Sequence, residues 1–385
     1  MENEKLLCRN EVSHDESQEI EKANFSALTL MLAQECNMRC SYCYGEGGEY
    51  NNKGIMTENV AFQAIDYLVK NSTDELLHIA FLGGEPLLNF PLLKKVVEYC
   101  KQISADTGKK FSYTITTNGT LITDNIEKYL TENKIVCQIS LDGTKEKNDM
   151  NRFFRNKKGS YDVIVEKTKS MRHMNLVTAR ATVTPDNSDY KEIFNHLNEL
   201  EFRAIPIAIA QNMVDDEQFD KILSEYINYI FYFEELILTK QYAKAKKMTD
   251  LVNALEKIEF GNVRNNGCGA GRTMFAVDID GTLYPCHRFV GERKFALGNI
   301  WTGSDNSKFL KMINVRNRDK CSKCWAQNLC LGCCPHENYT NTNNINLASE
   351  RSCRMAKTIY EKLISVYIKM SDCLLYTSPS PRDCS

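Results

Sequence analysis

Three cysteines near the start of the chain have a spacing that suits iron–sulfur chemistry. Cys36, Cys40 and Cys43 occur in the run ECNMRCSYCYG, a C-x3-C-x2-C pattern that supplies three thiolates close together. A [4Fe–4S] cluster has four irons, so three protein ligands leave one iron open. An open metal position can bind substrate directly, as in catalytic zinc sites. The pattern therefore predicts an enzyme.

The composition favours a cytoplasmic protein that holds metal through cysteine. The chain has 385 residues, 16 cysteines and a net charge of −2, so no strong field indicates nucleic acid or a membrane as a partner. No apolar run approaches the roughly 20 residues of a membrane span, and the N-terminus lacks a signal-peptide core. Cytosolic thiols stay reduced and tend to bind metal. We therefore expect a cytoplasmic metalloprotein.

Strand-like and helical segments alternate along the first half of the chain. An apolar run at 26–34 leads directly into the cysteine loop, as a strand that ends at a metal site would. The expected strands are 26–34, 77–82, 111–117, 135–141, 179–184 and 204–209, and the expected helices between them are 87–104, 123–133, 160–174 and 188–200. This alternation predicts parallel βαβ units. Sites in such folds lie at the carboxyl ends of strands.

Three polar motifs follow expected strands. The first is GGEP at 83–86, whose glycines allow close backbone approach to a ligand and whose Glu85 can accept from an ammonium. Taken alone, GGEP is equally compatible with an ordinary turn. The others are TTNG at 116–119 and SLDG at 140–143. Asn118 and Asp142 in these motifs could simply cap the next turn.

Together with the aromatic Tyr42 just before the last cysteine, these motifs resemble the signature of the radical S-adenosylmethionine (radical SAM) enzymes. The resemblance covers residues 26–360 and implies an α/β fold, a partial (β/α)6 TIM-type barrel. It implies that the three cysteines hold a [4Fe–4S] cluster coordinated with S-adenosyl-L-methionine, whose 5′-deoxyadenosyl radical abstracts hydrogen from substrate in a dry enclosure. The other cofactor contacts that it implies are Tyr42, Gly83, Gly84, Glu85 and Ser140.

A second group of cysteines follows residue 266. Eight cysteines lie between Cys268 and Cys353, and their order and spacing resemble the SPASM extension of radical enzymes that modify peptides. That resemblance implies two auxiliary [4Fe–4S] clusters, although a pair of zinc sites would use the same thiolate chemistry. It implies that one cluster takes Cys321, Cys324, Cys330 and Cys353 and the other takes Cys268, Cys286 and Cys334.

The second of these ligand sets is one cysteine short. Some relatives place an extra cysteine soon after the first ligand, but the segment 269–285 contains none. Cys333 could fill the vacancy, although neighbouring residues of an extended stretch point to opposite sides. We therefore expect an open iron, which could hold a substrate thiolate while a C–S bond forms.

The amino-acid sequence of residues 268–300 and 325–339 resembles that of maturases that install thioether bridges in ribosomal peptides. The main expectation is therefore a radical SAM oxidoreductase that forms a cysteine thioether in a precursor peptide. The alternatives are oxidation of serine or cysteine to formylglycine, as in sulfatase-maturing relatives, an iron–sulfur electron carrier, and a zinc-stapled interaction module. Expected partners are a cysteine-containing precursor peptide and a reductant such as flavodoxin or ferredoxin. His287 and His336 adjoin the cluster segments and are interpreted as hydrogen-bonding neighbours of the clusters rather than as ligands. No catalytic base can be assigned.

The remaining segments complete the expected organisation. The basic run 152–158 is interpreted as a solvated loop, from which Arg152 could meet the cofactor carboxylate. The run CLLYTSPSPRD at 373–383 matches one frame of a transposase-type sequencing adapter, so Cys373 and Cys384 are discounted. The expected parts are a polar segment 1–25, possibly truncated, a barrel 26–210, a helical connector 211–262, a SPASM domain 263–360, a terminal helix 361–372 and an adapter artefact 373–385.

Overall fold

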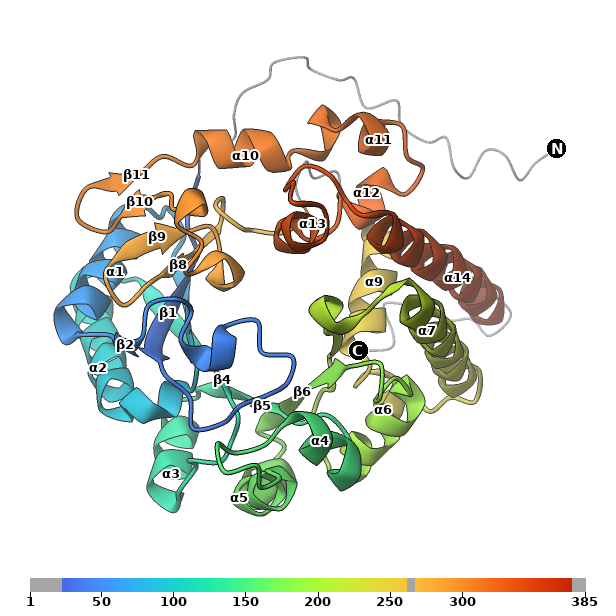
Figure 1. Cartoon of the computed structure of the whole chain (residues 1–385), viewed down its shortest axis with the longest axis horizontal. Coiled ribbons are helices and arrows are strands. Elements are labelled where there is room, and N and C mark those ends of the chain that lie inside the picture. The colour runs from blue at the N-terminus through green and yellow to red at the C-terminus, as the bar shows by residue number, and fades with distance from the viewer. Residues whose placement is uncertain (1–22, 262–266, 376–385) are drawn as a thin grey trace.

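The fold is a partial parallel barrel whose strands follow the predicted order. The computed structural model describes residues 23–261 and 267–375, so most of the polar N-terminal segment and the expected adapter segment from residue 376 onward lie outside the described residues. Six strands pair in parallel in the order β1-β3-β4-β5-β6-β7 and curve through the molecule (Figure 1). Their bounds are β1 Ala27–Gln34, β3 Leu76–Gly83, β4 Lys110–Thr117, β5 Val136–Ser140, β6 Val177–Val183 and β7 Ile207–Ile209. The six predicted strands are confirmed.

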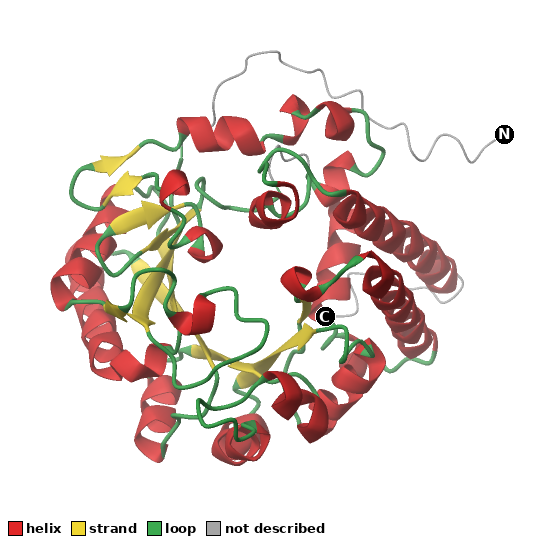
Figure 2. Cartoon of the chain, viewed as in Figure 1, coloured by secondary structure: helices red, strands yellow, loops and turns green. Residues whose placement is uncertain are grey.

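Helices cover the outer face of this sheet (Figure 2). They are α1 Glu58–Lys70, α2 Phe90–Thr107, α3 Asp124–Glu132, α5 Tyr161–His173 and α6 Tyr190–Glu199. Burial alternates along β3, β5 and β6, whereas every residue of β1 from Leu30 onward is buried. In β6, Ala179 and Ala181 are buried while Arg180 and Thr182 are partly exposed. Successive side chains of a strand point to opposite faces. One row of each strand therefore packs under the helices, and the other row lines the inside of the barrel.

The cysteine-rich segment continues the same sheet. Strand β8 (Met274–Val277) pairs in parallel with β1, and β9 (Thr282–Tyr284), β10 (Gly298–Asn299) and β11 (Gly303–Ser304) follow as antiparallel neighbours. Beyond the end of β8, on the same side of β1, the short β2 (Gly54–Ile55) pairs antiparallel with the end of β1. The strand that leads into the first cysteine loop is thus hydrogen-bonded directly to the C-terminal part of the chain.

Helices also form the connector and surround the later cysteines. The connector contains α7 (Asp216–Leu238), α8 (Tyr242–Ala245) and α9 (Thr249–Phe260), which agrees with its predicted helical character. The remaining α-helices are α4 Lys145–Asn151, α10 Ser307–Ile313, α11 Asp319–Ser322, α12 Gln327–Cys330, α13 Pro335–Thr342 and α14 Glu350–Leu375. Single 3-10 turns occupy Glu46–Gly48, Pro86–Asn89, Gln211–Met213, His287–Phe289, Arg293–Phe295 and Val315–Asn317.

Two features differ from the sequence prediction. The terminal helix begins at Glu350 rather than at 361, because buried residues such as Met355, Leu363 and Val366 form one stripe that packs on α7 and α9. Cys353 consequently lies within this helix. The short helix α4 was not predicted, since its sequence KEKNDMN has no apolar periodicity.

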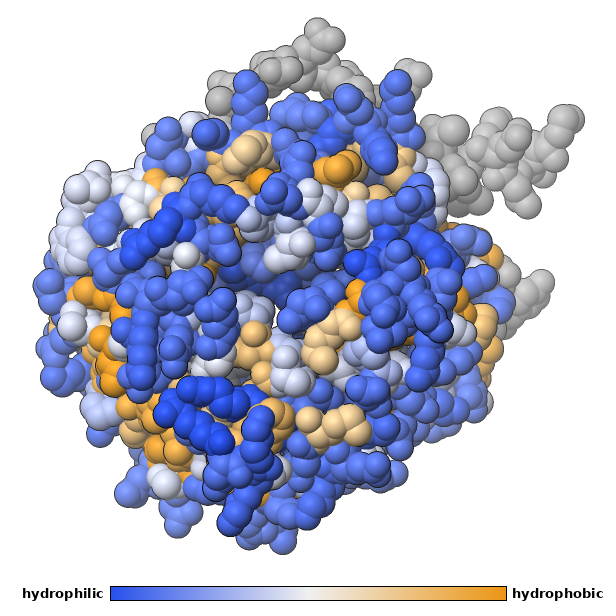
Figure 3. All heavy atoms as spheres, viewed as in Figure 1, coloured by the Kyte–Doolittle hydropathy of each residue, from blue (hydrophilic) through white to orange (hydrophobic). Residues whose placement is uncertain are grey.

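The surface is hydrophilic over most of one face and is hollowed near the centre of that face (Figure 3). Among the described residues, no helix is both long and apolar enough to cross a membrane.

Candidate cofactor site

The first three cysteines lie in one loop at the carboxyl end of β1, and each is partly exposed. The backbone N–H of Met38 donates to Cys36 Sγ over 3.4 Å, and the Arg39 guanidinium donates to the carbonyls of Cys36 and Met38. Burial raises the pKa of the Cys36 thiol to about 11 and also raises the pKa of Cys40. A metal must therefore displace protons from these thiols as it binds.

The glycines of GGEP bring the end of β3 against this loop. The backbone N–H of Gly84 donates to Ala33 O over 2.7 Å, and a Cβ on Gly84 would lie 2.3 Å from Glu35 O. Gly48 also packs closely against this loop, because a Cβ on Gly48 would lie 2.8 Å from Cys36 Cβ. Sequence reasoning missed Gly48. The close approach that the glycines allow is thus an approach to the cysteine loop itself.

Glu85 joins the ends of two strands. Its carboxylate is fully buried and accepts from Leu87 N, Thr117 Oγ1 and Asn118 N at 3.0, 2.6 and 2.8 Å. Burial raises the pKa of this carboxyl, and the three hydrogen bonds oppose that shift. Glu85 therefore positions Asn118, whose side-chain amide lies 3.8 Å from Cys36 Sγ. Its predicted contact with an ammonium group stays a prediction.

Tyr42 links the cysteine loop to the end of β5 through two charged groups. Its hydroxyl donates to Asp142 Oδ2 over 2.6 Å and accepts from Arg152 Nη1 over 2.7 Å. Asp142 also accepts from the backbone N–H of Thr182, so it does more than cap a turn. Among the described residues, the buried Nε of Arg152 has no hydrogen-bond partner. This donor is available for the cofactor carboxylate that the sequence analysis considered for Arg152.

Ser140 ends β5 and lies opposite Arg180 of β6 in the sheet register. Both residues are partly exposed on the inner face of the barrel. Ser140 is therefore placed where a ligand inside the barrel could reach it, and its predicted contact with the cofactor stays a prediction.

The later cysteines fall into two groups of electrostatic neighbours, and their assignment as two sets of cluster ligands stays a prediction. In the first, the Cys334 and Cys268 thiols lie close enough to Cys286 to reinforce the effect of burial, which raises the pKa of Cys286 to about 12. In the second, Cys353 has three cysteines as electrostatic neighbours. These neighbours are Cys330, Cys321 and Cys324.

Cys333 lies with the second group. Its Sγ is 3.4 Å from the Sγ of Cys330, and this contact lowers the pKa of Cys330 to about 6 and raises that of Cys333. The prediction of an extended stretch here is wrong, because Leu331, Gly332 and Cys333 all have positive φ and form a tight turn. The turn directs Cys333 toward Cys330 and leaves Cys334 near Cys268 and Cys286.

Polar groups surround the first auxiliary group. Arg288 donates to Glu337 over 2.7 Å and lies 3.9 Å from Cys334 Sγ. Burial lowers the pKa of His287 and of His336 to about 4, so both imidazoles are neutral near pH 7. The role of the two histidines as hydrogen-bonding neighbours of a cluster stays a prediction.

The donor set of the first loop fits a [4Fe–4S] cluster. It offers soft thiols that form no disulfide, together with an N–H directed at one sulfur. Within residues 23–261 and 267–375, no three His, Cys, Asp or Glu side chains gather tightly enough to hold a single metal ion. The fit therefore rests on donor chemistry, and clustered thiols favour iron–sulfur ligation.

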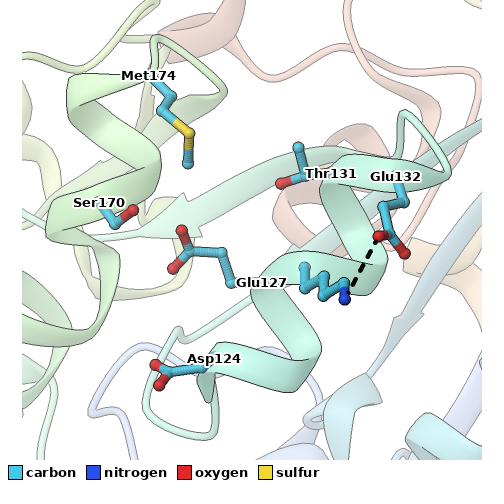
Figure 4. A pocket seen from close by; sticks show the side chains of 7 residues that line it. Asp124, Glu127, Thr131, Glu132, Ser170 and Met174 are labelled. Carbon is cyan, nitrogen blue, oxygen red and sulfur yellow. Dashed lines mark ion pairs between the residues drawn. The ribbon is translucent and has the colours of Figure 1, made fainter.

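One of two surface hollows is lined by cysteines, and the other is not. A cavity of about 420 Å³ between α7, α9 and α14 is lined by Cys330, Cys333 and Cys334, so it belongs to the auxiliary groups. A groove of about 350 Å³ lies between α3 and the end of α5, where Glu127 faces Ser170 (Figure 4). No predicted site residue lines this second groove.

Comparisons with known proteins agree with this arrangement. Residues 31–200 match the radical SAM superfamily, and residues 268–325 match an iron-sulfur cluster-binding domain, SPASM. The chain is 26% identical to a cysteine-type anaerobic sulfatase-maturating enzyme of Clostridium novyi, covering 92% of this chain and 99% of the relative. It is 22% identical to the radical SAM cyclopropyl synthase TigE of Paramaledivibacter caminithermalis, covering 88% and 74%.

A solved structure shares the fold. Native anSMEcpe with bound AdoMet and Cp18Cys peptide matches with a TM-score of 0.76 and 22% identity, covering 91% of this chain and 100% of that one. The matches to the two family models show that the chain belongs to the radical SAM superfamily and carries a SPASM domain. It is a radical SAM enzyme whose cofactors are S-adenosylmethionine and iron–sulfur clusters.

Proposed function

We propose that this enzyme oxidises a cysteine or serine side chain of a peptide or protein substrate to formylglycine. The observation that carries the proposal is the similarity to the cysteine-type anaerobic sulfatase-maturating enzyme, which extends over 99% of that relative and so includes both cysteine regions. The similarity to a serine-type enzyme of the same name, at 24% identity, supports the same reaction. This reaction replaces thioether formation as the leading proposal.

In this proposal the chain holds its cofactor between two sets of residues. Cys36, Cys40 and Cys43 would ligate a [4Fe–4S] cluster, and Arg152 and Ser140 would face the cofactor from the barrel. When bound, S-adenosylmethionine would supply hydrogen-atom abstraction from the substrate Cβ. The substrate must also lose one proton and one electron, and clusters held by the auxiliary cysteines would accept that electron. A serine substrate would then carry the aldehyde, whereas a cysteine substrate would carry a thioaldehyde, from which water would release hydrogen sulfide.

Thioether formation is retained as a second candidate because of one observation. Three cysteines, Cys268, Cys286 and Cys334, form the first auxiliary group, while Cys333 lies against Cys330. An iron left open there would have room for a substrate thiolate, as C–S bond formation requires.

Mass spectrometry of a synthetic cysteine peptide separates the two reactions. The enzyme is reconstituted anaerobically and supplied with reductant and S-adenosylmethionine, and a peptide with alanine in place of cysteine serves as the matched control. An aldehyde in place of the thiol supports the leading proposal. Loss of two hydrogens with a thiol protected from alkylation, and no aldehyde, supports the second candidate. Production of 5′-deoxyadenosine with no change in any cysteine or serine peptide would overturn both.

A further inference from the structure

The basic run that sequence analysis treated as a solvated loop is attached to the first cysteine loop. Backbone pairing joins Met38 to Phe154, and Arg39 N–H donates to Phe153 O over 2.8 Å. The Arg155 guanidinium then donates to the Cys36 carbonyl through Nε at 3.2 Å and Nη2 at 2.8 Å. The loop is therefore attached to the backbone beside Cys36.

The tip of this loop presents three cations to solvent. Arg155, Lys157 and Lys158 are exposed, and we call these three residues the basic tip. A tight turn holds them together, since Lys157 N–H donates to Phe154 O and Phe154 N–H donates to Lys158 O. The Lys157 ammonium lies 4.3 Å from the centre of the Phe153 ring, a cation–π contact within the loop.

The charge of the basic tip is not neutralised within the chain. Among the described residues, no ion pair within 4.0 Å involves any of these three side chains. The nearby carboxylate of Asp149 accepts instead from Tyr161 N–H, and Glu49 pairs with Arg39. Hydrophilic side chains cover this part of the surface, over the loop between α4 and α5 (Figures 1 and 3).

We infer that the basic tip is the docking surface for an acidic one-electron carrier protein that reduces the cluster at Cys36, Cys40 and Cys43. The carrier gives up one electron, and the cluster gains that electron. Like-charge repulsion excludes basic partners, while opposite charge raises the encounter rate of an acidic one. Contact through Arg155 and the Cys36 carbonyl sets the docked partner directly over the cluster loop. The inference is independent of which peptide the enzyme modifies.

Reduction kinetics of the reconstituted holoenzyme test this inference. The variants are the triple R155Q/K157Q/K158Q, the double K157Q/K158Q, which leaves the Arg155 bond to Cys36 intact, and a control. The control, K94Q/K128Q/K169Q, removes one exposed lysine from each of α2, α3 and α5, all outside the cysteine loop. Each protein is assayed for 5′-deoxyadenosine with dithionite and, separately, with reduced flavodoxin as the acidic carrier.

We expect dithionite-driven formation of 5′-deoxyadenosine to be unchanged in the double variant and the control. With flavodoxin at low salt, the rate should fall about tenfold or more in the triple and about threefold or more in the double variant, within the range of electrostatic steering. The salt dependence of the rate and the affinity for oxidised flavodoxin in calorimetry should weaken in parallel.

Three results would overturn the inference. The first is a flavodoxin rate in the double variant equal to that of the wild type at low salt. The second is an equal loss with dithionite and flavodoxin in the double variant, which would make the loop a structural support alone. The third is a loss of affinity for an acidic peptide with the flavodoxin rate unchanged, which would assign the surface to substrate. None of these outcomes depends on formation of a modified peptide.

Discussion

Replacing Gly84 by alanine should displace the cysteine loop from its position against the end of β3. An alanine Cβ would lie 2.3 Å from Glu35 O, 2.6 Å from Glu35 C and 2.8 Å from Gly48 O. All three contacts are to backbone atoms, so no side-chain rotation relieves them. The loop beside Cys36 must shift by roughly 0.7 Å or more, at a cost of about 1–3 kcal/mol for overpacking. A misplacement of about 1 Å at a reacting centre can lower a rate by about 100-fold.

Iron analysis and product yield measure this effect, and Gly108→Ala is the matched control. Gly108 ends α2 with φ of +74°, and no atom lies within 4 Å of a Cβ there, so alanine adds only backbone strain of about 1–2 kcal/mol. After anaerobic reconstitution, G84A should lose about four of roughly twelve irons, one of three clusters. Formation of 5′-deoxyadenosine should fall at least tenfold, whereas G108A keeps both. Wild-type iron content and yield in G84A would refute the reasoning.

Three further perturbations have defined outcomes. Tyr42→Phe removes the donor to Asp142 and an acceptor of Arg152, so the free energy of unfolding in urea should fall by about 1–3 kcal/mol, and an unchanged value contradicts the network. Cys333→Ala should retain the wild-type iron content on chemical analysis, whereas loss of about four irons would make Cys333 a required ligand. Burial lowers the pKa of His78, so the unfolded chain protonates first below about pH 6.5 and stability is lost as pH falls. H78N should flatten the acid-side fall of the thermal midpoint, and an unaltered slope counts against this assignment.

The barrel strands could be predicted because the pattern of apolar and polar residues that defines each strand lies within the strand itself. In β6 the alternation of buried and half-exposed residues is continuous over Val177–Val183, and the same period is legible in the sequence. The pairing of β8 with β1 was not predictable in this way. Its register depends on contacts between residues more than 240 positions apart, such as Ala27 with Met274, and periodicity carries no information about the partner of a strand.

The candidate site could likewise be predicted only in part. The three cysteines and GGEP were recognisable as sequence motifs. Gly48 belongs to no motif, and its role follows from its position against Cys36 and Gly84. The role of Asp142 was underestimated because its partner Tyr42 is 100 residues away. Arg155 was assigned to a solvated loop for the same reason, since a basic run in sequence does not reveal that its backbone pairs with the cysteine loop.

The choice between the two proposed reactions depends on a turn of three residues. Leu331, Gly332 and Cys333 have φ values of 54°, 80° and 62°. Residues other than glycine seldom adopt positive φ, and a run of three such residues is rarer still. A Cβ on Gly332 would meet Arg318 Nη1 at 2.4 Å, and Arg318 Nη1 donates to Gly332 O, so packing holds the turn in place. Because this turn directs Cys333 toward Cys330, the proposed ligand set of the first auxiliary group keeps three thiols. A cluster held by that set would have one iron without a cysteine ligand, and a substrate thiolate has the right chemistry to bind it. Formylglycine formation does not need this vacancy, whereas thioether formation uses it. Spectroscopy of the reconstituted auxiliary clusters with and without a cysteine peptide thus separates the two reactions before any product is made. A spectral change that the cysteine peptide produces and an alanine peptide does not would favour thioether formation. The absence of such a change would favour oxidation to formylglycine.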